Sequence, residues 1–218
     1  MIPRLALGGH EAMAFDLPGH GADPTPVEDV TFSRYVESTV QAILSADTPA
    51  IVVGHSFGGA IARQAAARAP GRVRSIVSVA SIWPPEGGTL LGCVDGLDPD
   101  YLAEILWAED RRSARLSEAG VRRFAFFGCP PADIESALPL MTAEPVAPYE
   151  TPLIFPELEI PHYYVECLQD RVIPIETQRR MHAGFPAGRT YQLDTDHGPF
   201  FSAPDEFARL LGGIAGRD

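Results

Sequence analysis

Apolar residues follow two different spacings in the first 80 positions of the chain, and these spacings predict strands that alternate with helices. Short apolar runs at residues 12–15, 50–53 and 72–80 predict buried strands. Residues 32–44 place apolar side chains at helical spacing and follow Thr31, a good N-cap, so they predict a helix. An alanine-rich stretch after the apolar run at 50–53 predicts another helix. This order predicts an α/β fold, with a mostly parallel sheet and helices on both faces.

The pattern changes after residue 80, where loops rich in proline and glycine separate segments of helical spacing. These segments cover about residues 98–107, 111–126 and 131–141, and no alternating pattern between them predicts a strand. A helical insertion of this length is typical of a cap, or lid, over an active site, although a packed decoration without a gating role has the same pattern. The domains that we expect are the N-terminal part of the core (1–80), a helical cap (81–160) and the C-terminal part of the core (161–218).

Strand patterns return in the C-terminal part of the core. Residues 162–167 and 190–193 predict two more strands, and residues 174–183 and 205–211 predict helices. The predicted sheet therefore continues on the far side of the cap.

The composition of the 218-residue chain favours a single domain. With 45% hydrophobic and 21% charged residues, the chain can bury one large core. Its formal net charge of -12 argues against a nucleic acid or an anionic membrane surface as a partner. The sequence holds no apolar run long enough to span a bilayer and no signal-peptide pattern, so we expect a soluble, cytoplasmic protein.

The cysteines predict neither a disulfide framework nor a zinc site. Cys93, Cys129 and Cys167 are odd in number and widely spaced. Free, mostly buried thiols are the simpler interpretation, and we expect no metal.

The segment Gly54-His55-Ser56-Phe57-Gly58 follows the apolar run at 50–53 and precedes the alanine-rich helix. A G-x-S-x-G sequence between a strand and a helix predicts a nucleophile elbow, with Ser56 at the apex of a sharp turn. We expect glycine at positions 54 and 58 because the turn brings strand and helix close together. The first turn of the helix offers free N–H groups that would stabilise an oxyanion near Ser56.

An acid and a base for Ser56 are expected beyond the ends of later strands. Asp170 follows the strand at 162–167 and His197 follows the strand at 190–193, and the carboxyl ends of parallel strands meet at one edge of the sheet. A serine nucleophile needs an imidazole to take its proton, and the imidazole needs a carboxylate to orient it. Ser56, Asp170 and His197 are therefore the predicted catalytic residues.

Other residues of the same types are weaker candidates. Asp16, Asp194 and Asp196 compete as the acid, but Asp194 and Asp196 lie too close to His197 in sequence for convenient geometry. Among the histidines, His55 lies inside the elbow and is expected to point away from the nucleophile. The remaining histidines occupy turns, the start of a strand or the end of a helix: His10, His20, His162 and His182.

Four motifs together resemble the α/β-hydrolase superfamily, and within it the methylesterase and hydroxynitrile-lyase branch with its bacterial esterase relatives. They are Asp16-Leu17-Pro18-Gly19-His20-Gly21, Gly54-His55-Ser56-Phe57-Gly58-Gly59, Gln169-Asp170-Arg171-Val172-Ile173-Pro174 and Asp196-His197-Gly198-Pro199-Phe200. The resemblance implies that Ser56 is the nucleophile, His197 the base and Asp170 the acid, with the Phe57 N–H as an oxyanion donor. It further implies hydrolysis of a small ester, thioester or lactone without an organic cofactor or metal.

The resemblance also exposes two departures from the family pattern. Family members begin with a strand that ends in a His-Gly motif and supplies a second oxyanion donor, whereas this chain starts after that strand. We therefore expect a sheet truncated at the N-terminus, a second donor that is not in this chain, and a marginally stable or self-associating protein whose longer form is the competent enzyme. Hydroxynitrile lyases of the branch carry a catalytic lysine near the acid, and its absence here argues against cyanohydrin cleavage.

Two other functions stay open on the sequence alone. One is a non-hydrolytic lyase or cyclase of the same fold that uses His197 as a base. The other is a catalytically impaired relative that binds a small molecule.

Overall fold

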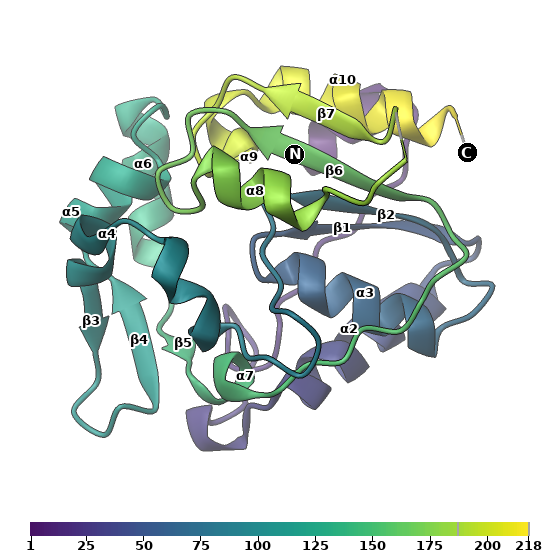
Figure 1. Cartoon of the computed structure of the whole chain (residues 1–218). Coiled ribbons are helices and arrows are strands. Elements are labelled where there is room, and N and C mark those ends of the chain that lie inside the picture. Colours follow the sequence, from purple (N-terminus) through teal and green to yellow (C-terminus); the bar gives the residue numbers. More distant parts are fainter. Residues whose placement is uncertain (187, 218) are drawn as a thin grey trace.

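The centre of the molecule is a sheet of four parallel strands (Figure 1). The computed structural model describes residues 1–186 and 188–217, with only the backbone at residues 94 and 95. In spatial order the strands are β1 (Ala50–His55), β2 (Val73–Val79), β6 (His162–Cys167) and β7 (Thr190–Leu193). The expected α/β fold, with a parallel sheet and helices on both of its faces, is confirmed.

Two layers of helices cover the two faces of this sheet. On one face lie α2 (Phe32–Ser45) and α3 (Gly58–Arg68); on the other lie α10 (Pro204–Ala215) and the short α1 (Ile2–Leu7). Successive residues of a strand point to opposite faces, and β2 shows the result. Ile76 belongs to the cluster with α2 and α3, whereas Val77 belongs to the cluster with α10. Both faces of the central strands are buried, as their continuous apolar runs require.

Side-chain caps mark the start of α2 and of α4, a short helix in the segment after β2. Thr31 caps α2 by accepting a hydrogen bond from the Arg34 N–H at 3.2 Å, and Asp98 caps α4 (Pro99–Ala103) through the Asp100 N–H at 2.8 Å. In the part of the chain that the structure describes, no helix combines the length and apolar character needed to cross a membrane. The remaining short elements of the core are η1 (Val27–Asp29), α8 (Ile175–Met181) and α9 (Pro199–Ser202).

The strand expected at residues 12–15 is not formed. This segment has no regular structure, and Met13 and Phe15 are 60% and 43% exposed. An extended segment becomes a strand only when a neighbour pairs with its backbone, and among the described residues none does. As a result β1 pairs with β2 alone and is an edge of the sheet, with Val53 44% exposed.

The segment between β2 and β6 holds strands as well as helices, which the sequence pattern did not predict. Three short antiparallel strands pair in the order β3 (Ile105–Trp107), β4 (Ser113–Leu116) and β5 (Glu144–Pro145). Strands of two to four residues are too short to display an alternating pattern, and for this reason helices were expected over most of these positions. The short helical elements here are η2 (Leu91–Gly96), α4, α5 (Glu118–Gly120), η3 (Val121–Ala125), α6 (Pro131–Ala137), η4 (Leu138–Leu140) and α7 (Ala147–Glu150). Figure 1 shows most of this segment beside one end of the central sheet.

A buried carboxylate ties β6 to its neighbours. Glu166 is 2% exposed and lies 2.8 Å from His182 Nε2, while its other oxygen accepts a hydrogen bond from Gln192 Nε2 at 2.8 Å. Replacing Glu166 with alanine leaves these side chains without their partner, so we expect a loss of about 2 kcal/mol in the free energy of unfolding. Urea unfolding followed by circular dichroism measures it. The exposed Glu157→Ala is the control, and equal stability of the two variants would contradict the prediction.

Candidate active site

Ser56 occupies a sharp turn between β1 and α3. Its φ of 52° lies in the left-handed region, which is uncommon for residues other than glycine and marks a constrained backbone. The turn is held by a hydrogen bond of 2.9 Å from the Ser56 N–H to the Val79 carbonyl of β2. A Cβ at Gly54 would lie 2.3 Å from the Gly58 carbonyl oxygen, so glycine at position 54 is required, as expected.

The expectation that position 58 also needs glycine is wrong. A Cβ added at Gly58 would meet nothing within 4 Å, whereas one at Gly59 would lie 2.4 Å from Ser81 Oγ. Ser81 in turn donates to the Gly54 carbonyl at 3.0 Å, so it fills the space between the strand and the helix. Close packing at the elbow therefore depends on Gly54 and Gly59.

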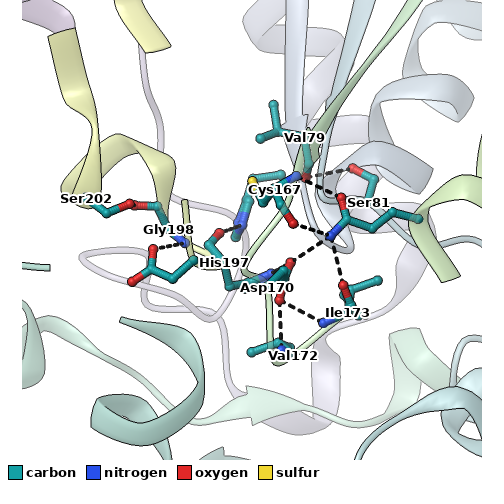
Figure 2. Close-up of polar contacts among 12 residues, drawn as sticks. Val79, Ser81, Cys167, Asp170, Val172, Ile173, His197, Gly198 and Ser202 are labelled. Carbon is teal, nitrogen blue, oxygen red and sulfur yellow. Dashed lines mark hydrogen bonds and ion pairs between the residues drawn. The ribbon is translucent and has the colours of Figure 1, made fainter. Parts of the chain in front are cut away.

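Asp170 and His197 are in direct contact. His197 Nδ1 lies 2.7 Å from Asp170 Oδ2, and the Asp170 side chain is fully buried (Figure 2). The other carboxylate oxygen accepts hydrogen bonds from the backbone N–H groups of Val172 and Ile173 at 2.7 and 2.9 Å. An ionised carboxylate only accepts, so Nδ1 must carry a proton, and in a neutral ring Nε2 then has a free lone pair. This is the tautomer that a general base requires.

Gln178 holds the loop that carries Asp170, and the sequence analysis missed it. This fully buried side chain on α8 donates to the carbonyls of Cys167 and Ile173 at 3.1 and 2.8 Å and approaches Asp170 Oδ2 at 3.3 Å. It also accepts from the Cys167 N–H at 3.0 Å. No short motif links a glutamine to an acid eight positions earlier, so only the fold could reveal this role.

The His55 side chain contacts His197, which the sequence analysis did not predict. Its Nε2 lies 2.6 Å from the His197 carbonyl oxygen, and the two rings lie 4.4 Å apart. Burial, reinforced by the neighbouring His197, lowers the pKa of His55 to about 3, so its ring is neutral. Because a carbonyl only accepts, the neutral ring must donate from Nε2. His55 therefore fixes the backbone of the residue that contacts Asp170.

Removing this donor should disturb the position of His197. For His55→Phe, which keeps an aromatic ring and loses the hydrogen bond, we expect kcat for ester hydrolysis to fall about 3- to 10-fold, the equivalent of one hydrogen bond. Steady-state kinetics with p-nitrophenyl acetate measures it, and thermal melting checks that the variant is folded. An unchanged kcat would mean that the bond has no positioning role.

Ser56 is not hydrogen-bonded to His197 in this structure. Within the described residues, neither Ser56 Oγ nor His197 Nε2 has a hydrogen-bond partner, and the Phe57 N–H donates to no backbone oxygen. Catalytic hydrogen bonds are often long without substrate. The fold brings Asp170 and His197 together and places Ser56 next in sequence to His55, which contacts His197.

The rival acids are occupied elsewhere. Asp196 accepts hydrogen bonds from the N–H groups of Gly128 and Gly198 at 2.8 and 3.1 Å. It therefore links the loop that carries His197 to the segment after η3. Asp194 accepts from Gln169 Nε2 at 2.8 Å, and the exposed Asp16 accepts from the Ala22 N–H at 2.9 Å. None of the three bonds to the His197 ring.

A second serine–histidine pair lies inside the sheet. Ser78 Oγ is 2.8 Å from His162 Nε2, but Ser78 is fully buried within β2, one residue before the strand ends. The His162 ring packs against Trp83 and Phe185, with ring centres 5.8 and 4.6 Å away. Among the described residues no carboxylate bonds to His162. A buried hydroxyl without an elbow is unsuited to attack a substrate carbonyl.

His182 and His20 have structural partners. His182 bonds to Glu166, and His20 Nε2 lies 2.8 Å from the Tyr35 hydroxyl. Across residues 1–186 and 188–217, no group of three histidine, cysteine, aspartate or glutamate side chains is placed to hold a metal ion. The three cysteines are free thiols, and Cys129 and Cys167 are buried.

The chain is similar to known proteins over nearly its whole length. The pyrethroid hydrolase of Sphingobium wenxiniae is 28% identical, over 99% of this chain and 81% of its own length. Methylesterase 7 of Arabidopsis thaliana is 27% identical, over 97% of this chain and 88% of its own. A crystal structure of the pyrethroid hydrolase PytH has a TM-score of 0.83 at 26% identity and covers 99% of this chain and 90% of that one.

Two further comparisons bear on the fold and the family. A crystal structure of polyneuridine aldehyde esterase has a TM-score of 0.87 at 22% identity, covering 98% of this chain and 91% of that one, and shows the same fold. The family model described as "Alpha/beta hydrolase family" matches residues 1–210. The chain therefore belongs to the alpha/beta hydrolase family.

Proposed function

We propose that this chain is a serine esterase that hydrolyses small carboxylic esters through Ser56, His197 and Asp170. The observation that carries the proposal is the 2.7 Å contact between Asp170 and His197 at the end of the sheet where Ser56 occupies its left-handed turn. Relatives named as a pyrethroid hydrolase and a methylesterase support ester hydrolysis as the reaction class.

In the first half of the proposed reaction, Ser56 Oγ attacks the ester carbonyl carbon and His197 Nε2 takes the hydroxyl proton. Asp170 stabilises the resulting imidazolium and keeps its ring oriented. The carbonyl oxygen becomes an oxyanion, for which the Phe57 N–H at the start of α3 is the proposed donor. Collapse of the intermediate breaks the bond to the alcohol, which leaves with the proton from His197.

In the second half, water replaces the alcohol. His197 Nε2 takes a proton from the water, and the water oxygen attacks the carbonyl carbon of the acyl group on Ser56. The acid product leaves and Ser56 recovers its proton. The substrate is a small molecule, and residues 81–160 are the proposed cap over it.

A fluorophosphonate probe tests the proposal, because it reacts only with an activated serine. We expect labelling of the intact protein on the peptide that contains Ser56, together with hydrolysis of p-nitrophenyl acetate and p-nitrophenyl butyrate. Mass spectrometry locates the label. A folded protein that neither takes the label nor hydrolyses either ester would contradict the proposal and favour a binding or non-hydrolytic role.

A further inference from the structure

Residues 123–129, which we call the bridging segment, contact both loops that carry the proposed acid and base. These are the acid loop (residues 168–173, with Asp170) and the base loop (residues 194–198, with His197). The bridging segment begins in η3, a π-helical turn of a kind that often occurs at functional sites, and ends before α6. Figure 1 shows α5 and α6, which flank it, on the side towards which the arrows of β6 and β7 point. The bridging segment therefore lies at the end of the sheet that carries the candidate site.

On the acid loop, the contact is made by Arg171, the residue after Asp170. Its Nη1 donates a hydrogen bond to the Arg123 carbonyl at 3.2 Å, and its guanidinium lies 3.6 Å from the centre of the Phe127 ring. A guanidinium this close to a ring face is attracted by the negative charge density of the ring. Arg171 also precedes Val172, whose N–H group holds the Asp170 carboxylate at 2.7 Å. The bridging segment therefore holds the backbone that binds the acid.

On the base loop, the contact is made by Asp196, the residue before His197. Its Oδ2 accepts hydrogen bonds from the Gly128 N–H at 2.8 Å and from the Cys129 thiol at 3.5 Å. Burial and the charge of Asp196 raise the pKa of Cys129 to about 12, so this thiol keeps the proton that it donates. The other oxygen of Asp196 accepts from the Gly198 N–H at 3.1 Å. One buried carboxylate thus binds both the bridging segment and the base loop.

The Phe126 ring packs against the backbone directly after His197. A Cβ added at Gly198 would lie 2.7 Å from two carbon atoms of this ring, so glycine permits the close approach. The Phe126 and Phe201 rings, with centres 5.3 Å apart, extend the contact into α9. On the side of the core, His55 holds the His197 carbonyl. The base loop is therefore fixed between the core and the bridging segment.

We propose that the bridging segment positions the acid and the base relative to each other, with Arg171 and Asp196 as the positioning residues. This inference rests on the proposed esterase function, in which His197 keeps its 2.7 Å contact with Asp170 while it takes and returns a proton. An error of about 1 Å in such a contact can lower the rate about 100-fold. The proposed cap therefore positions the catalytic residues in addition to covering the substrate.

A pair of variants at Phe127 tests the contact with the acid loop. Phe127→Leu removes the ring face beside Arg171, and Phe127→Tyr keeps it. We expect Phe127→Leu to lower kcat for p-nitrophenyl acetate about 3- to 10-fold and to leave KM within about twofold of the wild type. Phe127→Tyr should retain the wild-type kcat. The matched control is Phe155→Leu, which removes a ring 4.3 Å from the Arg63 guanidinium outside the bridging segment and should not change kcat.

Asp196→Ala tests the contact with the base loop. It leaves the N–H groups of Gly128 and Gly198 without their acceptor, so we expect kcat to fall about 10- to 100-fold. Asp196→Asn keeps an acceptor oxygen and should lose less. Proton NMR gives a second readout that needs no turnover, because the Nδ1 proton between His197 and Asp170 gives a far-downfield resonance. This resonance should weaken or shift in Asp196→Ala and in Phe127→Leu, and remain unchanged in Phe127→Tyr.

The two readouts separate this inference from the esterase proposal. If Phe127→Leu or a folded Asp196→Ala kept both the wild-type kcat and the wild-type resonance, the positioning role would be overturned and the esterase would stand. An equal loss of kcat in Phe127→Tyr and Phe127→Leu would also overturn it. If the wild type hydrolysed no ester while the resonance still changed in both variants, the positioning role would stand and the esterase would be contradicted. Thermal melting checks the folding of each variant, and if Asp196→Ala does not fold, the Phe127 pair decides.

Discussion

Replacing Ser56 with alanine is expected to reduce kcat for p-nitrophenyl acetate by at least about 10⁴-fold, because the variant has no hydroxyl to form the acyl-enzyme. The fold should survive, since Ser56 lies at the surface end of β1 and its side chain makes no hydrogen bond to a described residue. The left-handed backbone costs serine and alanine about the same, because both carry a Cβ, so we expect the stability to change little. Steady-state rates and thermal melting measure the two effects separately.

The matched control for this variant is Ser78→Ala. Ser78 is the other serine that faces a histidine, and it is buried in β2. Its replacement should lower the stability, because His162 loses its hydrogen-bond partner. The kcat should stay within about threefold of the wild type. If Ser78→Ala abolished hydrolysis in a folded protein while Ser56→Ala did not, the assignment of the nucleophile would be wrong.

Replacing Asp170 with asparagine is expected to reduce kcat by about 10⁴-fold with little change in KM. The amide would still accept from the Val172 and Ile173 N–H groups, so the loop should remain in place. The asparagine cannot, however, stabilise an imidazolium, and its NH₂ group favours the wrong tautomer of His197. The split between kcat and KM distinguishes this loss from a general loss of folding.

Asp196→Asn is the control for the acid. Asp196 is buried like Asp170 and lies directly before His197, but its carboxylate does not contact the His197 ring. Its asparagine variant should lose less than about 10-fold in kcat, a value typical of one altered hydrogen bond. A larger loss of kcat for Asp196→Asn than for Asp170→Asn would mean that Asp196, and not Asp170, is the acid that orients His197.

Local patterns predicted the parts of the molecule that depend on local physics. The elbow around Ser56 follows from a strand, a turn and a helix that are contiguous in sequence. The Asp170 and His197 contact follows from a general property of parallel sheets, whose carboxyl ends share one edge. Helix α2 and its cap at Thr31 follow from spacing and capping alone.

The features that were missed depend on residues far apart in sequence. The segment 12–15 has the composition of a strand, but strand formation needs a pairing partner that composition cannot report. Gly59, and not Gly58, faces a close neighbour because Ser81 of a later segment occupies that space. His55 and Gln178 hold the segments of His197 and Asp170 through backbone carbonyls, and such contacts leave no pattern in the sequence.

Backbone hydrogen bonds to Asp170 affect which substitutions the neighbouring positions can tolerate. The N–H groups of Val172 and Ile173 hold the carboxylate, and every amino acid except proline supplies such a group. Both side chains are buried, at 6% and 3% exposure, so selection at these positions acts on size and apolar character. In a saturation library screened for hydrolysis, positions 172 and 173 should therefore accept several aliphatic residues and reject proline, whereas position 170 should accept almost nothing. The two backbone N–H groups would therefore still hold the Asp170 carboxylate after the side chains at positions 172 and 173 had changed.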